Sequence, residues 1–167
     1  KAGELQRDLA DSGARALVSS DHGYAAVSGI RDATELAAVA LTSYADYLPK
    51  SPTLPVPPSF QAPPESFDRT ESFARIVTES KPLAWPEPRA LTDTALLQYT
   101  SGTTGAPKGA EITHGNIVAN CELQRVYVDA GDNDVVLAVL PWFHITGMEC
   151  QLNLAASSRN RIRTLPA

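Results

Sequence analysis

Residues 95–109 read ALLQYTSGTTGAPKG, a short apolar segment that runs into a loop rich in glycine and hydroxyl side chains. The apolar residues 95–99 are typical of a strand. The ten residues that follow carry four hydroxyl side chains, three glycines and one lysine. Glycines let backbone amides approach an anion, hydroxyls add neutral donors, and Lys108 supplies positive charge. This stretch therefore predicts a polyphosphate-binding loop between a strand and a following helix.

Two other interpretations of this loop compete with phosphate binding. The Walker A pattern G-x-x-x-x-G-K-[ST] does not fit, because Lys108 follows Gly105 by three positions and precedes Gly109. A P-loop ATPase is therefore disfavoured. A flexible Gly/Ser/Thr linker stays open on composition, although linkers seldom carry a Pro-Lys pair or lie between a strand and a capped helix.

Helix and strand signals on both sides of the loop indicate an α/β fold. Leu5 and Leu9 share a helical face, and Gly13 is placed to end that helix. Helices are also expected over 71–80, from His114 to about Val128 with Thr113 as its cap, and from near Thr146. Strands are expected over 16–18, 36–41 and 135–140. The last two are continuously apolar, which predicts strands covered on both faces, as in a parallel sheet.

Proline and glycine residues are concentrated in different parts of the chain. Ten of the 13 prolines lie between Pro49 and Pro88, and no glycine occurs between Gly29 and Gly102. Residues 49–64, PKSPTLPVPPSFQAPP, predict an extended, polyproline-like chain that runs over a surface. We interpret this segment as a connector rather than as a recognition module.

Charge and composition exclude several classes of protein. The chain has 14 Lys and Arg against 19 Asp and Glu, a formal charge of −5, so it lacks the positive field needed for broad nucleic-acid or anionic-membrane binding. The longest apolar run, 135–143, is far shorter than the roughly 20 residues of a membrane span. Two cysteines, Cys121 and Cys150, lie in apolar contexts typical of buried thiols, which favours a reducing, cytoplasmic setting.

Residues 99–109, YTSGTTGAPKG, resemble the phosphate-loop signature of the adenylate-forming superfamily, which includes acyl-CoA synthetases, aryl-CoA ligases and the adenylation domains of peptide synthetases. A second family motif, LPWFHITGM, follows at 140–148. The resemblance implies an α/β, partial parallel-sheet N-terminal domain of such an enzyme, incomplete at both ends. Residues 1–154 would be an internal part of this large AMP-binding domain, and 155–167, which carry three arginines, an atypical tail.

The resemblance also implies roles for the loop residues. Lys108 would hold the departing pyrophosphate as a catalytic residue, and Thr100 would lie near a magnesium ion. The residues that would bind the phosphates of ATP are Thr100, Ser101, Gly102, Thr103, Thr104, Gly105 and Lys108. Each role agrees with the hydroxyl, glycine and lysine chemistry of the loop.

Trp142, Phe143 and His144 directly follow the expected strand 135–140, at the edge of an α/β sheet where ligands bind. Without further signals, a pair of aromatic residues more often belongs to the hydrophobic core, and a single histidine more often has a structural role. The resemblance implies instead that these residues and Gly147 line the pocket for a carboxylate substrate. His144 would position that substrate as a catalytic residue, and not as a general base, because a carboxylate is already ionised near neutral pH.

The second motif limits the class of carboxylic acid that the enzyme is expected to use as its substrate. Amino-acid-activating relatives place an aspartate just after the aromatic residue, whereas this chain has His144-Ile145, with no carboxylate to balance a substrate ammonium. An unsubstituted fatty or aryl acid is therefore favoured, and the motif is most similar to that of fatty-acyl-CoA ligases.

The implied reaction uses ATP, Mg²⁺, coenzyme A and a small-molecule carboxylic acid, with no nucleic acid as partner. The resemblance places a further part of the large domain and a small C-terminal domain downstream of these residues, so the 167-residue chain is expected to be inactive alone. The alternatives are a non-catalytic nucleotide-binding remnant and an enzyme that adenylates an aryl or amino acid.

Overall fold

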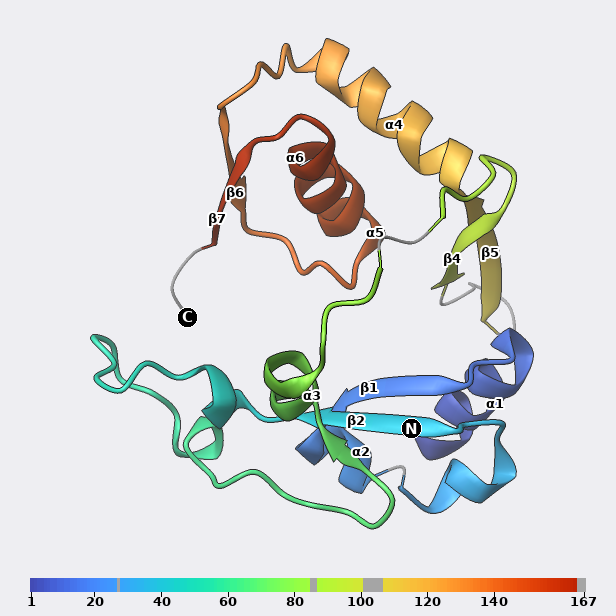
Figure 1. Ribbon diagram of the computed structural model, residues 1–167, viewed down its shortest axis with the longest axis vertical. Coiled ribbons are helices and arrows are strands. Elements are labelled where there is room, and N and C mark those ends of the chain that lie inside the picture. Colours follow the sequence, from blue (N-terminus) through green and yellow to red (C-terminus); the bar gives the residue numbers. More distant parts are fainter. Residues whose placement is uncertain (27, 85–86, 101–106, 165–167) are drawn as a thin grey trace. The chain divides into compact units, whose positions relative to one another are not determined.

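The computed structural model describes residues 1–26, 28–84, 87–100 and 107–164, and the chain forms two compact units, Lys1–Trp85 and Pro86–Ala167 (Figure 1). Both units combine helices with small sheets, as expected for an α/β protein. In the parts of the chain that the structure describes, no helix has the length and apolarity needed to cross a membrane.

The first unit is built on a three-stranded parallel sheet in the order β1-β2-β3. The strands are β1 (Ala16–Ser20), β2 (Ala38–Thr42) and β3 (Glu71–Ser72). The helices are α1 (Ala2–Ser12), α2 (Asp21–Ala25) and α3 (Phe73–Glu79), with 3-10 turns at Ser28–Ala33, Tyr44–Tyr47 and Pro58–Phe60. Gly13, with a φ of 61°, ends α1. The predicted helix, its glycine stop and the parallel strands are confirmed.

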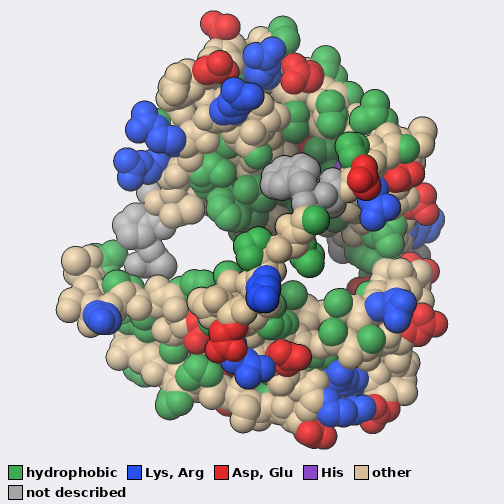
Figure 2. All heavy atoms as spheres, in the orientation of Figure 1, with side chains coloured by type: hydrophobic (Ala, Val, Ile, Leu, Met, Phe, Trp, Pro, Cys, Tyr) green, Lys and Arg blue, Asp and Glu red, His purple; other side chains and the backbone are tan. Residues whose placement is uncertain are grey.

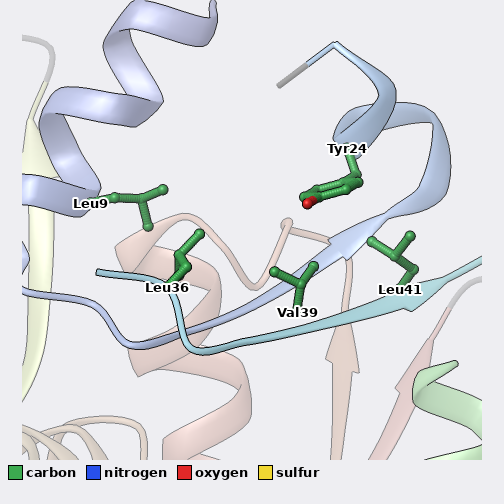
Figure 3. Packing of buried hydrophobic residues seen from close by; sticks show 5 residues of the cluster. All are labelled: Leu9, Tyr24, Leu36, Val39 and Leu41. Atoms are coloured by element: carbon green, nitrogen blue, oxygen red, sulfur yellow. The ribbon is translucent and has the colours of Figure 1, made fainter. Parts of the chain in front are cut away.

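The core of this unit lies on one face of β2 (Figure 3). Val39 and Leu41 point into it and are 3% and 6% exposed, whereas Ala38 is exposed. The prediction that 36–41 is covered on both faces is therefore wrong, because β2 alternates and places its small alanines away from the core. The core residues come from α1, α2 and the β2 segment: Leu9, Tyr24, Leu36, Val39 and Leu41. Each such leucine or valine contributes about 1.5–3 kcal/mol.

The proline-rich residues 49–64 are mostly exposed and have their own local contacts. The rings of Tyr44 and Phe60 stack with centroids 4.1 Å apart. Gln61 donates from Nε2 to the Val56 carbonyl oxygen at 2.8 Å. The connector thus folds back on itself at its 3-10 turn, Pro58–Phe60.

Asp21 attaches the end of this connector to the sheet. Its side chain is 1% exposed, and its carboxylate accepts from the backbone amides of His22 at 2.8 Å and Glu65 at 3.1 Å. Burial alone would raise the pKa of Asp21, but the hydrogen bonds from Glu65, His22 and the Ser43 hydroxyl outweigh burial and lower that pKa.

The helix expected over 71–80 begins later than predicted. Ser72 caps α3 by accepting a hydrogen bond from the Arg75 amide, so the helix starts at Phe73. Glu71 and Ser72 instead pair with Ala40 and Leu41 as β3.

The second unit carries two two-stranded sheets and a helical layer. Strands β4 (Thr94–Thr100) and β5 (Lys108–Thr113) are antiparallel, and β6 (Val135–Ala138) and β7 (Arg161–Thr164) are parallel. Helix α4 spans His114–Tyr127, and α5 (Ile145–Gly147), a π-helical segment η4 (Met148–Asn153) and α6 (Leu154–Ser157) follow one another. The predicted helices from His114 and from near Thr146 are confirmed. Part of the segment 155–167 belongs to α6 and β7.

Two predictions for this unit are wrong. The glycine-rich stretch was expected between a strand and a helix, but it joins two strands, because residues 108–113 pair with β4 before α4 begins. Residues 135–140 were expected to be a buried strand, yet Val135 and Leu137 are 52% and 53% exposed, and hydrophobic side chains reach the surface of this unit (Figure 2). In β6 only the alternate face, which includes the buried Ala138, is covered.

The two cysteines differ. Cys121, in α4, is buried as predicted, and burial raises the pKa of its thiol. Cys150 is exposed, so the prediction of a second buried thiol is wrong. Cys150 lies on the outward side of the π-helical segment, between the buried side chains of Glu149 and Gln151.

Candidate functional site

The β4–β5 hairpin holds both ends of the expected phosphate loop. Thr100 is the last residue of β4 and Lys108 the first of β5, and the two residues are paired across the ladder. Both side chains are exposed. The other expected phosphate-binding residues, Ser101, Gly102, Thr103, Thr104 and Gly105, lie outside the described residues.

The next pair of the ladder explains one glycine of the motif. Tyr99 pairs with Gly109, and a Cβ at Gly109 would lie 3.1 Å from the Tyr99 ring. The tyrosine ring therefore lies over the glycine backbone and occupies the space of its missing side chain. A larger residue at Gly109 would push the ring away from the strand just before Thr100.

The hairpin is attached firmly to α4. Thr113 ends β5 and caps the helix: its Oγ1 accepts from the Asn116 amide at 3.1 Å, while its own amide donates to Asn116 Oδ1 at 3.0 Å. Gly115 donates from its amide to the Leu91 carbonyl at 2.8 Å, and a Cβ at Gly115 would lie 2.9 Å from that oxygen. Because these three hydrogen bonds lie at the junction, the strand and the helix keep a fixed orientation.

The second motif forms a tight turn that leads into α5. The His144 amide donates to the Pro141 carbonyl at 3.1 Å, and the Thr146 amide donates to His144 Nδ1 at 3.2 Å. Gly147 is buried against this turn, since a Cβ there would lie 2.8 Å from the Pro141 carbonyl carbon. The glycine is thus required for the close approach of the helix to the turn.

The side chains at the tip of this turn are accessible. Trp142 is 40% exposed and Phe143 86% exposed, so neither is a core residue of the described structure. His144 is also exposed. Because its Nδ1 accepts a hydrogen bond from the Thr146 amide, the ring proton belongs on Nε2, and the neutral ring offers one donor to a ligand. The structure thus brings Trp142, Phe143 and His144 together at one exposed turn, with Gly147 beneath it.

Sequence reasoning missed three polar residues that make hydrogen bonds to the segments before and after this turn. Glu149 and Gln151, in the π-helical segment, are only 7% and 9% exposed, and Asn120 of α4 donates to Glu149. The signal was present: Glu149 and Gln151 stand in a helix whose neighbours are largely apolar. Because buried polar side chains require hydrogen-bond partners, this pattern could have predicted that Glu149 and Gln151 bond to neighbouring segments.

Comparisons with known proteins find relatives that match part of this chain. The long-chain-fatty-acid–CoA ligase of Bacillus subtilis (strain 168) is 46% identical over 63 residues, which cover 36% of this chain and 11% of that protein. The feruloyl-CoA synthase of an Amycolatopsis species is 46% identical over 65 residues, which cover 38% of this chain and 13% of that protein. The chain therefore spans only a small part of the length of these relatives.

Solved structures share the fold. The long-chain-fatty-acid-CoA ligase from Archaeoglobus fulgidus matches with a TM-score of 0.70 and 23% identity over 97% of this chain and 28% of that chain. ATP-bound MatB from Rhodopseudomonas palustris matches with a TM-score of 0.65 and 20% identity over 99% and 28%. The family model described as AMP-binding enzyme matches residues 1–166, and so also includes most of the segment 155–167. Because that match covers nearly the whole chain, the chain belongs to the AMP-binding enzyme family.

Proposed function

We propose that these residues belong to an acyl-CoA synthetase that activates a carboxylic acid with ATP. In the first step a carboxylate oxygen attacks the α-phosphorus, which gives acyl-AMP and releases pyrophosphate. In the second step the thiol of coenzyme A attacks the acyl carbon, which gives the thioester, AMP and a proton. The observation that carries this proposal is the hairpin that presents Thr100 and Lys108 together at the two ends of the motif TSGTTGAPK, in a chain of this family.

The loop residues supply donors to the phosphates. In this proposal the backbone and hydroxyl groups of residues 100–105 bind the β- and γ-phosphates, and Lys108 neutralises charge on the pyrophosphate as it leaves. ATP use is supported by the solved structure of ATP-bound MatB, which shares the fold. Lys108 is exposed at a strand end, so its ammonium is available to a ligand.

A magnesium ion fits the phosphate-loop residues if most of its ligands are substrate phosphates and water. In the part of the chain that the structure describes, no group of three or more His, Cys, Asp or Glu side chains gathers to hold a metal. Mg²⁺ is usually held by few protein ligands, together with substrate phosphates and water, and the exposed hydroxyl of Thr100 can serve as one such ligand. When bound, the ion would neutralise phosphate charge.

We propose a fatty acid as the substrate. The relatives' names cover several acids, including long-chain fatty acids, feruloyl groups and sulfoacetate, so they support the acyl-CoA ligase class more broadly than one acid. Trp142 and Phe143 at the exposed turn offer apolar contact, and the position after His144 is the apolar Ile145. His144 Nε2–H would donate to a carboxylate or acyl-phosphate oxygen and so position it.

The proposed domain organisation extends the chain beyond these residues, because they cover only a small share of the relatives' length. Residues 1–154 form an internal part of a large AMP-binding domain with a connector at 49–64, and 155–167 form a segment of less typical sequence. Further parts of that domain and a C-terminal domain complete the enzyme. We place it in the cytoplasm, with the acid, ATP and coenzyme A as its partners and no nucleic acid.

Pyrophosphate release tests the proposal. The full-length enzyme that contains these residues is incubated with ATP, Mg²⁺ and a panel of fatty, aryl and amino acids, and the 167-residue chain is assayed in parallel. We expect release with fatty acids from the full-length enzyme and none from the short chain. Pyrophosphate release with amino acids alone would replace the proposed fatty acid by an amino acid as the substrate. ATP binding without pyrophosphate release from either protein would favour the non-catalytic nucleotide-binding remnant.

A further inference from the structure

Two buried polar side chains stand on the π-helical segment η4 that follows the second motif. Glu149 is 7% exposed and Gln151 is 9% exposed. Each makes two hydrogen bonds. π-helical turns are rare and occur frequently near functional sites. These two residues are therefore candidates for a role in shaping the site.

Gln151 binds the chain that enters the second motif. Its Oε1 accepts from the Leu140 amide at 3.1 Å, and its Nε2 donates to the Leu137 carbonyl at 3.3 Å. Strand β6 ends at Ala138, so the side-chain amide of Gln151 bonds the backbone at the point where the strand ends. One side chain therefore fixes residues 137–140, which lead directly into Pro141.

Glu149 makes its hydrogen bonds on the opposite side of η4 from Gln151. Its two carboxylate oxygens accept from Asn120 Nδ2 at 3.0 Å and Asn153 Nδ2 at 2.9 Å. Residues two positions apart point to nearly opposite sides of a helix, which agrees with Glu149 contacting α4 and Gln151 contacting the β6 segment. Helix α4 is itself joined to β5 and the phosphate hairpin through the Thr113 cap.

We propose that Gln151 is a positioning residue that sets where Trp142, Phe143 and His144 lie, and that Glu149 fixes the helix bearing it to α4. The turn cannot shift freely on its other side, because Gly147 is packed against Pro141. Loss of the Gln151 side-chain amide would take an acceptor from the Leu140 amide and a donor from the Leu137 carbonyl, so the segment before the motif would move toward water. The part of this inference that concerns acid binding rests on the proposed function.

The first test needs no catalysis. Hydrogen exchange on the wild-type full-length enzyme that contains these residues should show the Leu140 amide slowed relative to its intrinsic rate, although it lies beyond β6. Gln151→Met, which keeps the length of the side chain but removes the amide oxygen and nitrogen, should speed Leu140 exchange about 10-fold and shift the backbone amide resonances of residues 142–144. Gln124→Met, on α4, is the matched control and should change neither. Leu140 exchange at the intrinsic rate in the wild type overturns the proposal whether or not the variant folds.

The second test separates positioning from general damage. In the full-length enzyme, Gln151→Met should raise the KM for the acid about 10-fold while the KM for ATP stays within about twofold of the wild type. Glu149→Gln, which keeps one acceptor, should show a smaller rise of the same kind. Equal effects on both KM values, or an acid KM that matches the Gln124→Met control, would overturn the positioning role. If wild-type enzyme releases no pyrophosphate with any acid, the proposed function fails, and the exchange experiment alone decides the position of the turn.

Discussion

Thr100 faces Lys108 across the β4–β5 ladder, as the last strand pair before the phosphate-loop residues 101–107. The first hydroxyl and the only lysine of the motif therefore leave the sheet at the same point. Strand pairing fixes the backbone of Lys108 beside Thr100, and under the proposed function the exposed lysine side chain would reach from there toward the phosphates of ATP.

Lys108→Ala in the full-length enzyme should lower kcat/KM for pyrophosphate formation by about 100-fold, because a charge aimed at the leaving pyrophosphate acts mainly in the transition state. Steady-state pyrophosphate release with saturating Mg²⁺ measures this effect. Lys81→Ala, at an exposed lysine of the first unit, is the matched control and should leave the rate unchanged. An unchanged rate for Lys108→Ala would remove the role we give this lysine.

Gly147→Ala should displace the turn at residues 141–144. The new Cβ would lie 2.8 Å from the Pro141 carbonyl carbon, so either the backbone shifts or the unit loses about 1–3 kcal/mol of stability. Chemical unfolding and acid KM measure the two outcomes. Gly3→Ala in α1, where a Cβ meets nothing within 4 Å, should be neutral or slightly stabilising. Identical behaviour of the two variants would show that the turn tolerates a side chain.

Thr113→Ala should destabilise the second unit by about 1 kcal/mol, because the Asn116 amide loses its acceptor at the start of α4. Thr113→Ser, which keeps the hydroxyl, should restore most of that loss. Urea unfolding followed by helical circular dichroism gives both values. Equal stability of the alanine and serine variants would mean that the hydroxyl does not cap the helix in solution.

Local signals were enough to predict several elements. Gly13 at the end of α1 and Thr113 at the start of α4 act through their own backbone and side chain, so their roles are visible in the sequence. Strand β5 was missed, because Lys108-Gly109-Ala110 carries no alternating apolar pattern. Its pairing with β4 depends on a tertiary contact, including the fit of Tyr99 over Gly109.

The burial of strands was harder to predict than their existence. Val135 and Leu137 are apolar in sequence but exposed, because helical cover reaches only the alternate face of β6. The role of Gln151 also depends on tertiary structure, because its side-chain amide bonds the backbone of Leu140, eleven residues earlier in the chain. The phosphate and acid roles came from motif resemblance, and the functions of Lys108 and His144 remain predictions for the experiments above.

Asp21 should make the stability of the first unit depend on acid pH. Its pKa in the folded chain lies below its ordinary value of 3.8, so the carboxylate stabilises the fold above about pH 4, and this stabilisation is lost as the pH falls through the folded pKa. Asp21→Asn should cost about 1–3 kcal/mol at pH 7, because the backbone amides of Glu65 and His22 lose a charged acceptor, and the variant should lose less stability between pH 7 and pH 3. Urea unfolding followed through the Tyr24 resonances measures both.

Asp32→Asn is the matched control for this pH dependence. Asp32 pairs with Arg69 at 2.6 Å, and this pairing lowers the pKa of Asp32, but the side chains are 81% and 56% exposed. Solvent screens such a pair, so the control should lose little stability at pH 7 and keep most of the acid sensitivity of the wild type. Acid sensitivity that survives Asp21→Asn but disappears in Asp32→Asn would assign the effect to the surface ion pair and exclude the buried carboxylate as its cause.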